Sequence, residues 1–345
     1  MNTIIVNGAE DEAFSDAARA LREGKLVAFP TETVYGLGAN ALNPDAVKRI
    51  YEAKGRPSDN PLIVHIAEVS KLNELILEIP DTAVTLIEAF WPGPLTLVFK
   101  RSDRVPDIIT AGLDTVAVRM PDSIIAQTLI REAGVPVAAP SANLSGRPSP
   151  TTYKHVMEDL SGRIEYIIDG GPCQVGVEST VLDVTTKIPI ILRPGGITLE
   201  MLEKVLEKVD TDSVLEVRGD LKPRSPGMKY RHYSPKAEMI LISGETDSVV
   251  EKINQLIKDS NEKGLNVGVL TSFENAHQYN ADVVVKAGSV KNPNQIATGL
   301  YDSLRTFDEK NVDIIYSETF EEKGIGRAIM NRLRKASSGK IIEAK

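Results

Sequence analysis

The spacing of apolar residues over the first 210 positions switches repeatedly between helix-like and strand-like patterns. Residues 12–23 place apolar side chains three and four positions apart and end at Gly24, which predicts a helix. Asn43 followed by Pro44 predicts the cap and first turn of a second helix, which ends near residue 54. Strands are predicted at 25–29, 62–66, 95–100, 116–119, 135–139, 166–169, 179–184 and 188–192. This alternation predicts one α/β domain over residues 1–210.

The pattern is interrupted at residues 211–236 and then resumes in a simpler form. Residues 218–236 have no helical period and contain several prolines, which is typical of a linker. Strands are then predicted at 237–243, 267–271, 283–285 and 312–316, and helices at 246–263, at 294–308 and from residue 326 onward. This second pattern predicts a smaller Rossmann-like α/β domain over residues 237–345, in which helices cover a parallel sheet. The domain contains no GxGxxG or P-loop motif.

The composition of the 345-residue chain is that of an ordinary globular protein, with 42% hydrophobic and 26% charged residues. No apolar run is long enough to span a membrane, and the N-terminus lacks the features of a signal peptide. Cys173 is the only cysteine, which excludes an intrachain disulfide and a cysteine-based zinc site. We therefore expect a cytoplasmic protein with no membrane partner.

Charge is distributed unevenly along the chain. The net charge of −8 argues against a protein that simply coats nucleic acid. Residues 218–236, however, carry six basic side chains against one acid, Asp220, and the tail from Lys323 onward carries seven basic side chains against Glu343. The basic segment at 218–236 has two interpretations, a solvated linker or a segment that folds over an anionic ligand.

Polar residues follow predicted strands at two places in the N-terminal part of the domain. The segment 30–38 is predicted as a tight turn, whose threonines and glycines offer hydroxyl and backbone N–H groups. Lys54 and Arg56 are separated by glycine and followed by proline, with Asn60 and His65 further on. A lysine and an arginine in a stiff loop suit a polyphosphate. Each pattern taken alone is also compatible with an ordinary turn.

Two further segments repeat this arrangement, and ligands of open α/β sheets bind at the carboxyl ends of strands. Residues 140–149 supply Ser141, Asn143 and Ser149 after a predicted strand. Residues 176–180 contain Ser179, and the strand exits at Arg119 and Arg193 supply two more cations. Each arginine alone is compatible with a surface ion pair, but four basic residues at such positions in an acidic domain favour an anionic ligand.

Several kinds of chemistry are disfavoured by what the sequence lacks. The four histidines are dispersed without HExxH or comparable spacing, which argues against a metal site built from protein side chains. There is no G-x-S-x-G motif, and Cys173 has no histidine nearby in sequence. The remaining cationic and hydroxyl groups suit phosphoryl or nucleotidyl transfer, in which catalysis consists mainly of positioning and charge stabilisation.

Taken together, these segments resemble the long, two-domain form of the YrdC-like family of threonylcarbamoyl-AMP synthases. The similarity runs through essentially the whole chain and is weakest after Lys236. It is carried by PTETVYGLG (30–38), KGRP with Asn60-Pro61-Leu62 (54–62), WPGPLTLV (91–98), VAVRMP (116–121), APSANLSG (139–146), ESTVLD (178–183), RPG (193–195) and, for the long form, RSPGMKYRHYSP (224–235).

The resemblance implies a twisted open-sheet α/β domain with a deep basic cavity, which joins L-threonine, bicarbonate or CO2, and ATP and releases pyrophosphate. Other proteins would then transfer the threonylcarbamoyl group to the adenosine beside the anticodon of certain tRNAs, so that tRNA is only an indirect partner. By motif, L-threonine would be held by Thr33, His65, Arg119, Ala139 and Ser179. ATP would be held by Arg56, Asn60, Thr115, Ser141, Ser149 and Arg193, and the catalytic cluster around the phosphates would comprise Lys54, Arg56, Ser141 and Asn143.

The chemistry of these groups agrees with the implied roles. The guanidinium of Arg119 can pair with the threonine carboxylate. A carbamate formed on the threonine amine is already anionic and can attack the α-phosphate without an enzyme base. Lys54, Arg56, Arg193 and Mg²⁺ bound with ATP would spread the charge that develops on pyrophosphate. The linker residues Tyr230, His232 and Tyr233 are predicted to lie on a lid over the cavity.

Two other functions remain open at this point. The same fold could serve as an RNA-binding module without adenylate synthesis, although the acidic N-terminal domain argues against it. A carbamoyl-transfer enzyme of the hydrogenase-maturation type would need zinc-finger cysteines, and the single Cys173 cannot supply them.

Overall fold

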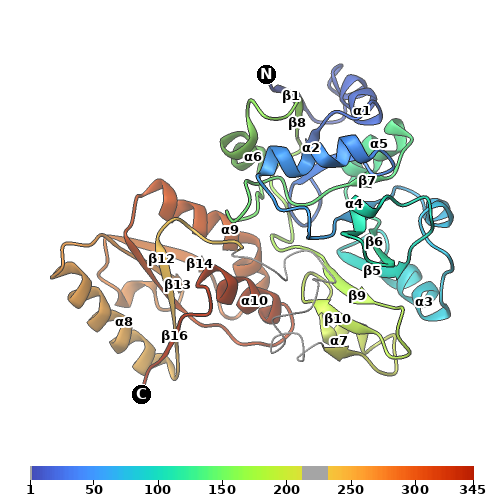
Figure 1. Ribbon diagram of the computed structural model, residues 1–345. Coiled ribbons are helices and arrows are strands. Elements are labelled where there is room, and N and C mark those ends of the chain that lie inside the picture. The colour runs from blue at the N-terminus through green and yellow to red at the C-terminus, as the bar shows by residue number, and fades with distance from the viewer. Residues whose placement is uncertain (1, 212–231) are drawn as a thin grey trace. The chain divides into compact units, whose positions relative to one another are not determined.

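The computed structural model describes residues 2–211 and 232–345 (Figure 1). The described chain divides into two units. The first contains residues 2–145 and 149–211, and the second contains residues 146–148 and 232–345. Most of the predicted linker, including Tyr230, lies outside the described residues.

In the described part of the first unit, eleven strands form one mixed sheet in the order β1-β8-β2-β3-β7-β4-β6-β5-β9-β10-β11. This confirms the predicted α/β fold. The strands are β1 (Ile4–Asn7), β2 (Val27–Phe29), β3 (Gly36–Asn40), β4 (Ile63–His65), β5 (Leu95–Lys100), β6 (Thr115–Arg119), β7 (Val137–Ala138), β8 (Tyr166–Asp169), β9 (Thr180–Asp183), β10 (Ile190–Arg193) and β11 (Asp210–Thr211). The helices are α1 (Phe14–Arg22), α2 (Pro44–Lys54), η1 (Val69–Glu74), α3 (Asp81–Phe90), α4 (Asp107–Thr110), α5 (Ile124–Ala133), α6 (Tyr153–Leu160) and α7 (Leu199–Leu202).

Helices cover both faces of this sheet. On one face, α1 and α5 pack together and bury apolar side chains such as Leu21 and Leu129 against β2 and β7. On the other face, α2, α3 and α6 bury residues such as Ile50, Leu86 and Val156 in a separate cluster. The strand exits therefore lie in a sheet that is fixed from both sides, which gives side chains at those exits a rigid base.

Helix α2 shows how local sequence sets the position of one candidate residue. The Asn43 side chain accepts hydrogen bonds from the N–H groups of Asp45 (3.0 Å) and Ala46 (3.2 Å), as expected of a cap. Gly55 ends the helix in the left-handed conformation, with φ of 60°. The predicted helix is thus confirmed, and its last residue, Lys54, is buried.

The segment 30–38 is only partly the tight turn that the sequence predicts. The turn ends near Val34, and Gly36 and Gly38 belong to strand β3. A Cβ atom at Gly38 would lie 2.8 Å from Cε1 of Phe29 and 3.1 Å from the carbonyl oxygen of Val27. Glycine is therefore required there because β3 lies close against the neighbouring strand and the Phe29 ring, not because the chain turns.

The second unit contains a sheet of five strands in the described residues, in the order β14-β13-β15-β12-β16. All its strand pairs are parallel, as predicted. Helix α8 packs on the sheet through Val249, Ile253 and Ile257, and α9 contacts α10. The elements are β12 (Glu238–Ser243), α8 (Thr246–Asn261), β13 (Val267–Ser272), η2 (Ala276–Gln278), β14 (Val283–Gly288), α9 (Pro293–Glu309), β15 (Ile314–Glu318), α10 (Gly326–Ala336) and β16 (Ile341–Glu343). No helix within the described ranges has the length and apolarity needed to cross a membrane.

A buried carboxylate, Glu318, ends strand β15 in the second unit. Its Oε1 accepts hydrogen bonds from Thr271 Oγ1 (2.9 Å), Asn275 Nδ2 (3.0 Å) and the Tyr279 hydroxyl (2.6 Å). Its Oε2 accepts one from the Ser272 N–H group (3.1 Å). Burial and this carboxylate together raise the pKa of Tyr279. The network ties the loop after β13 to the end of β15.

Candidate active site

Two of the predicted polar segments lie side by side in the first unit. The Leu37 N–H group donates to the carbonyl oxygen of Pro140 (2.8 Å), and the Ala142 N–H group donates to that of Tyr35 (2.8 Å). The Tyr35 N–H group in turn donates to the carbonyl oxygen of Pro150 (2.8 Å). Backbone pairing thus brings the segment 30–38 against residues 140–142 and Pro150, although more than 100 positions separate them in sequence.

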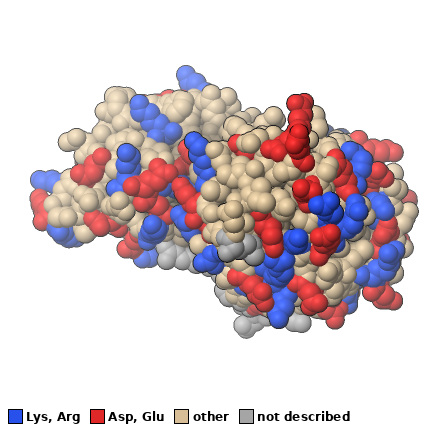
Figure 2. Space-filling view, turned by 90° about the horizontal axis from the view of Figure 1, so that it is seen from above, with Lys and Arg blue, Asp and Glu red and all other residues tan. Residues whose placement is uncertain are grey.

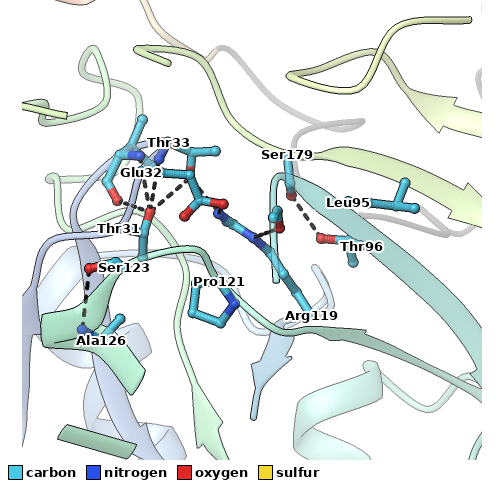
Figure 3. A network of polar contacts seen from close by, with 12 residues as sticks. Thr31, Glu32, Thr33, Leu95, Thr96, Arg119, Pro121, Ser123, Ala126 and Ser179 are labelled. Atoms are coloured by element: carbon cyan, nitrogen blue, oxygen red, sulfur yellow. Dashed lines mark hydrogen bonds and ion pairs between the residues drawn. The ribbon is translucent and has the colours of Figure 1, made fainter. Parts of the chain in front are cut away.

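Arg119, at the end of β6, is held in a buried position by three oxygen atoms (Figure 3). Its Nε donates to the carbonyl oxygen of Gly93 (3.1 Å), and its Nη1 donates to Oγ1 of Thr33 (3.0 Å). Its Nη2 lies 2.6 Å from Oε1 of Glu32. Thr33 and Arg119, both assigned to threonine by motif, are therefore in contact, and Glu32 joins them.

The turn that carries Glu32 and Thr33 is built by the Thr31 hydroxyl. Thr31 Oγ1 donates to the carbonyl oxygen of Val34 (2.7 Å) and accepts from the N–H groups of Thr33 (3.2 Å) and Val34 (3.3 Å). It also lies 2.8 Å from Oγ1 of Thr33. A short hydroxyl side chain that satisfies its own turn in this way fixes the direction of the two residues that face Arg119.

His65 lies next to Arg119 in the sheet, since the two residues are register partners in β4 and β6. Its ring packs edge-on against Phe29, with the ring centroids 6.4 Å apart. Burial and the nearby charge of Arg119 lower the pKa of His65 to about 3, so the imidazole is neutral at ordinary pH. Its Nδ1 has no hydrogen-bond partner in the described chain. Ala139, also assigned to threonine by motif, donates its N–H to the carbonyl oxygen of Ile63, two residues before His65 (3.0 Å).

Ser179 and Arg193 form a second group, at the neighbouring strands β9 and β10. Arg193 donates through Nη2 to the carbonyl oxygen (2.9 Å) and to Oγ (3.2 Å) of Ser179. The hydroxyl of Ser179 also lies 2.7 Å from Oγ1 of Thr96 on β5. All three side chains are buried. A residue assigned to threonine and one assigned to ATP are therefore in direct contact.

Lys54, Ser141 and Asn143 form a third group. The Lys54 ammonium donates to the carbonyl oxygens of Ser141 and Asn143, the latter at 2.6 Å, and lies 3.4 Å from Oδ1 of Asn143. Ser141 Oγ donates to the same Oδ1 (2.5 Å). Burial, and then the charge of Arg56, lower the pKa of Lys54. Lys54 thus holds the Ser141–Asn143 turn in shape.

The remaining residues assigned to ATP are more scattered. Asn60 is buried, and its Oδ1 has no hydrogen-bond partner in the described chain, whereas half-buried Arg56 donates to the carbonyl oxygen of Pro61 (3.4 Å). Ser149 donates to Oε1 of Glu178 (2.6 Å). Thr115 begins β6, four residues before Arg119, which places the two roughly 13 Å apart along the strand. The described contacts do not connect Thr115 to the other site residues.

Two of the three predicted lid residues are described, and both belong to the second unit. The Tyr233 ring lies against His232 and Tyr301, with centroid distances of 5.5 Å and 5.4 Å. The Arg332 guanidinium lies 5.5 Å from the centre of the Tyr233 ring. The lid and the deep basic cavity both stay predictions.

Three residues of these groups were not predicted from the sequence, namely Glu32, Thr96 and Glu178. All three lie inside segments that the sequence singles out. Carboxylates are not expected around anionic substrates, so the prediction of site residues considered only hydroxyl, amide and basic groups. The signal that could have found Glu32 is its position between the two threonines of the turn. Within the described ranges, no group of three or more His, Cys, Asp or Glu side chains could hold a metal ion.

Comparison with known proteins agrees with this architecture. A family model for Sua5, YciO and YrdC proteins, described as telomere recombination, matches residues 19–195. A second model, described as the C-terminal domain of threonylcarbamoyl-AMP synthase, matches residues 197–338.

Individual relatives match over nearly the full length. The threonylcarbamoyl-AMP synthase of Bacillus subtilis is 54% identical over 96% of this chain and 95% of its own. The threonylcarbamoyl-AMP synthase of Pyrococcus abyssi is 53% identical over 99% of both chains. The crystal structure of Pyrococcus abyssi Sua5 complexed with L-threonine superposes with a TM-score of 0.94, covering 99% of this chain and all of that one. The chain therefore belongs to the Sua5/YciO/YrdC family, in its two-domain threonylcarbamoyl-AMP synthase form.

Proposed function

We propose that this chain is a nucleotidyltransferase that forms L-threonylcarbamoyl adenylate and pyrophosphate from L-threonine, bicarbonate or CO2, and ATP. The observation that carries the proposal is the buried Arg119 guanidinium, held at a strand exit beside Thr33 and a neutral His65. Such a site suits a small ligand that has a carboxylate and a hydroxyl group. Full-length similarity to enzymes named for this activity, and to a relative solved with L-threonine, supports the assignment.

Threonine would be recognised by groups of the first unit. The Arg119 guanidinium has five N–H donors, and the described contacts use only three of them, so donors remain for the substrate carboxylate. The neutral imidazole of His65 can donate to, or accept from, the threonine hydroxyl. A buried site with such a polar partner rejects an analogue that lacks the hydroxyl.

ATP would be held by the groups that follow the neighbouring strands. Arg56 and Arg193 would bind phosphate oxygens, and Asn60, Thr115 and Ser149 would complete the nucleotide site. Lys54 would act through the turn of Ser141 and Asn143 that it holds, and its own charge would lie near the phosphates. Because no cage of acidic side chains is present in the described residues, Mg²⁺ would be held mainly by phosphate oxygens and water, where it supplies charge stabilisation.

The chemistry needs little acid–base assistance from the protein. The neutral amine of threonine bonds to the carbon of CO2 and loses a proton to give a carbamate. With bicarbonate, the same bond forms and the carbon–hydroxyl bond breaks, so that the hydroxide leaves with the amine proton as water. A carbamate oxygen then attacks the α-phosphorus, and the bond to pyrophosphate breaks. The protein aligns the two anions and offsets their charge through Arg56 and Arg193. The adenylate would pass to threonylcarbamoyl-transferase proteins that modify tRNA, and we extend the proposal to a cytoplasmic location.

The direct test is pyrophosphate release by the purified full chain with ATP and Mg²⁺, in the absence of RNA. We expect release only when both L-threonine and bicarbonate are added. Arg56→Ala should lower the rate by roughly 100-fold, because a charged hydrogen bond to the transferring phosphates is lost. Release that ignores threonine would contradict the proposed function and would direct attention to RNA binding instead.

A further inference from the structure

Glu32 is a buried carboxylate in the turn between β2 and β3, and nothing in the sequence motifs assigns it a role. Its side chain is almost fully buried, and its Oε1 lies 2.6 Å from Nη2 of Arg119. In the described residues, neither carboxylate oxygen accepts a well-aligned hydrogen bond. A carboxylate taken out of water with one ionic partner is costly, so its retention calls for an explanation.

The geometry around Arg119 supplies that explanation. Three oxygen atoms approach its guanidinium at three different nitrogen atoms: the carbonyl oxygen of Gly93, the hydroxyl of Thr33 and the carboxylate of Glu32. Of these partners, only Glu32 carries a charge. Glu32 therefore both neutralises the buried cation and fixes the rotation of the planar group.

The backbone of Glu32 is itself fixed by two contacts. The Thr31 hydroxyl closes the turn that contains it, and the carbonyl oxygen of Glu32 accepts a hydrogen bond from the Val175 N–H group (2.8 Å). Its direction toward Arg119 is thus built into the backbone. A residue whose backbone is held in this way can position a second side chain.

We propose that Glu32 is a positioning residue that aims the Arg119 guanidinium so that its remaining N–H donors face the carboxylate of L-threonine. The inference rests on the proposed function, because it concerns the same threonine site. Glu32 acts through Arg119 and not on the substrate. Without it, the guanidinium keeps only neutral partners and loses its fixed rotation, so threonine binding weakens while the nucleotide site is unaffected.

The test uses the full chain and steady-state pyrophosphate release, with KM measured separately for L-threonine and for ATP. Glu32→Gln keeps the size of the side chain and removes its charge. We expect the threonine KM to rise about 30-fold or more, because one member of a buried charge pair is lost, while the ATP KM changes by less than about threefold. Glu32→Asp, which keeps the charge on a shorter arm, should recover part of the effect.

Two controls distinguish an effect on the position of Arg119 from a general loss of folded structure. Glu165→Gln breaks another arginine–glutamate pair of the same unit, in which Oε1 of Glu165 lies 2.5 Å from Nη2 of Arg49, and it should leave both KM values unchanged. In an Arg119→Gln background, Glu32→Gln should add little to the threonine KM, since the two residues act as one unit. If Glu32→Gln does not fold, Glu32→Asp carries the same comparison of KM values.

The outcomes distinguish this inference from the proposed function. A threonine KM for Glu32→Gln within about twofold of that of the wild type would overturn the inference and leave the function standing, and so would an equal rise in both KM values. Absence of threonine-dependent release in the wild-type protein would overturn the function, and the inference would fall with it.

Discussion

The two units each bury a glutamate where a strand meets a loop, and the two carboxylates are satisfied very differently. Glu318 in the second unit receives four hydrogen bonds from Thr271, Ser272, Asn275 and Tyr279. Glu32 in the first unit has one ionic contact, with Arg119, and no well-aligned hydrogen bond in the described residues. Glu318 therefore has a structural role, whereas Glu32 belongs to a group whose polar atoms can still form hydrogen bonds with a ligand.

Among the described residues, two further buried polar atoms of the first unit are also unsatisfied. Buried Asn60 Oδ1 and His65 Nδ1 also have no hydrogen-bond partner within the described chain. Buried polar atoms normally find partners, so under the proposed function substrate atoms would complete these hydrogen bonds. On the face shown in Figure 2, by contrast, basic and acidic side chains are interspersed, as on an ordinary solvated surface.

The largest expected effect tests the structural role of Glu318. Glu318→Ala would remove the shared acceptor of four donors, three of them on buried residues, and we expect the free energy of unfolding of the second unit to fall by roughly 3–5 kcal/mol. The only tryptophan, Trp91, is buried in the first unit, so its fluorescence reports on that unit. Urea unfolding followed by far-UV circular dichroism should shift more than unfolding followed by Trp91 fluorescence.

Glu32→Gln is the matched variant in the first unit. It should shift the Trp91 transition and not the part of the circular dichroism signal that belongs to the second unit. If Glu318→Ala left stability unchanged and raised the threonine KM instead, the contrast between the two carboxylates would be wrong.

A smaller effect is expected from His65 on lowering the pH. The pKa of His65 falls from 6.5 to about 3 on folding because the ring is buried beside Arg119. The unfolded chain therefore binds a proton that the folded chain does not, and stability present above about pH 6.5 is lost toward pH 3, at ~1.4 kcal/mol per pH unit. His65→Asn should flatten the pH dependence of the Trp91 transition between about pH 6.5 and pH 5. An unchanged slope in that variant would show that other groups cause the acid sensitivity.

The smallest effect tests the link between Thr96 and Ser179. Thr96→Val removes one buried hydrogen bond but leaves Ser179 in contact with Arg193. We expect the free energy of threonine binding to weaken by about 1 kcal/mol, which would raise the threonine KM about fivefold. Thr110→Val, which removes another buried hydroxyl of the same unit, should leave the threonine KM unchanged. Equal behaviour of the two variants would argue against a role for Thr96 in the site.

The fold of the second unit could be predicted closely because its sequence alternates simply. Predicted strands at 237–243 and 267–271 match β12 and β13 within a residue or two, and the predicted helix at 294–308 matches α9. In the first unit, β3 was mistaken for part of a turn. The glycine at position 38 reflects close contact with Phe29, and a single sequence does not show which ring will lie against it.

The sequence predicted which cations and hydroxyl groups form the candidate site, but not the contacts between them. Strand-exit reasoning identified Arg119 and Arg193, and motif reasoning identified Thr33 and Ser179. Neither could show that Arg119 is paired with Glu32, since the pairing depends on contacts between distant strands. For the same reason, the sequence did not show that the Lys54 ammonium contacts backbone oxygens of the 141–143 turn, and its role at the phosphates stays a prediction.

The lack of a side chain at Gly38 matters beyond strand β3. Any Cβ there would press on the Phe29 ring, and that ring lies edge-on against His65. Under the proposed function, a substitution at this glycine would therefore disturb threonine selection through Phe29 and His65. Sequence variants at Gly38 and at His65 should therefore be interpreted together, because Phe29 lies between the two residues.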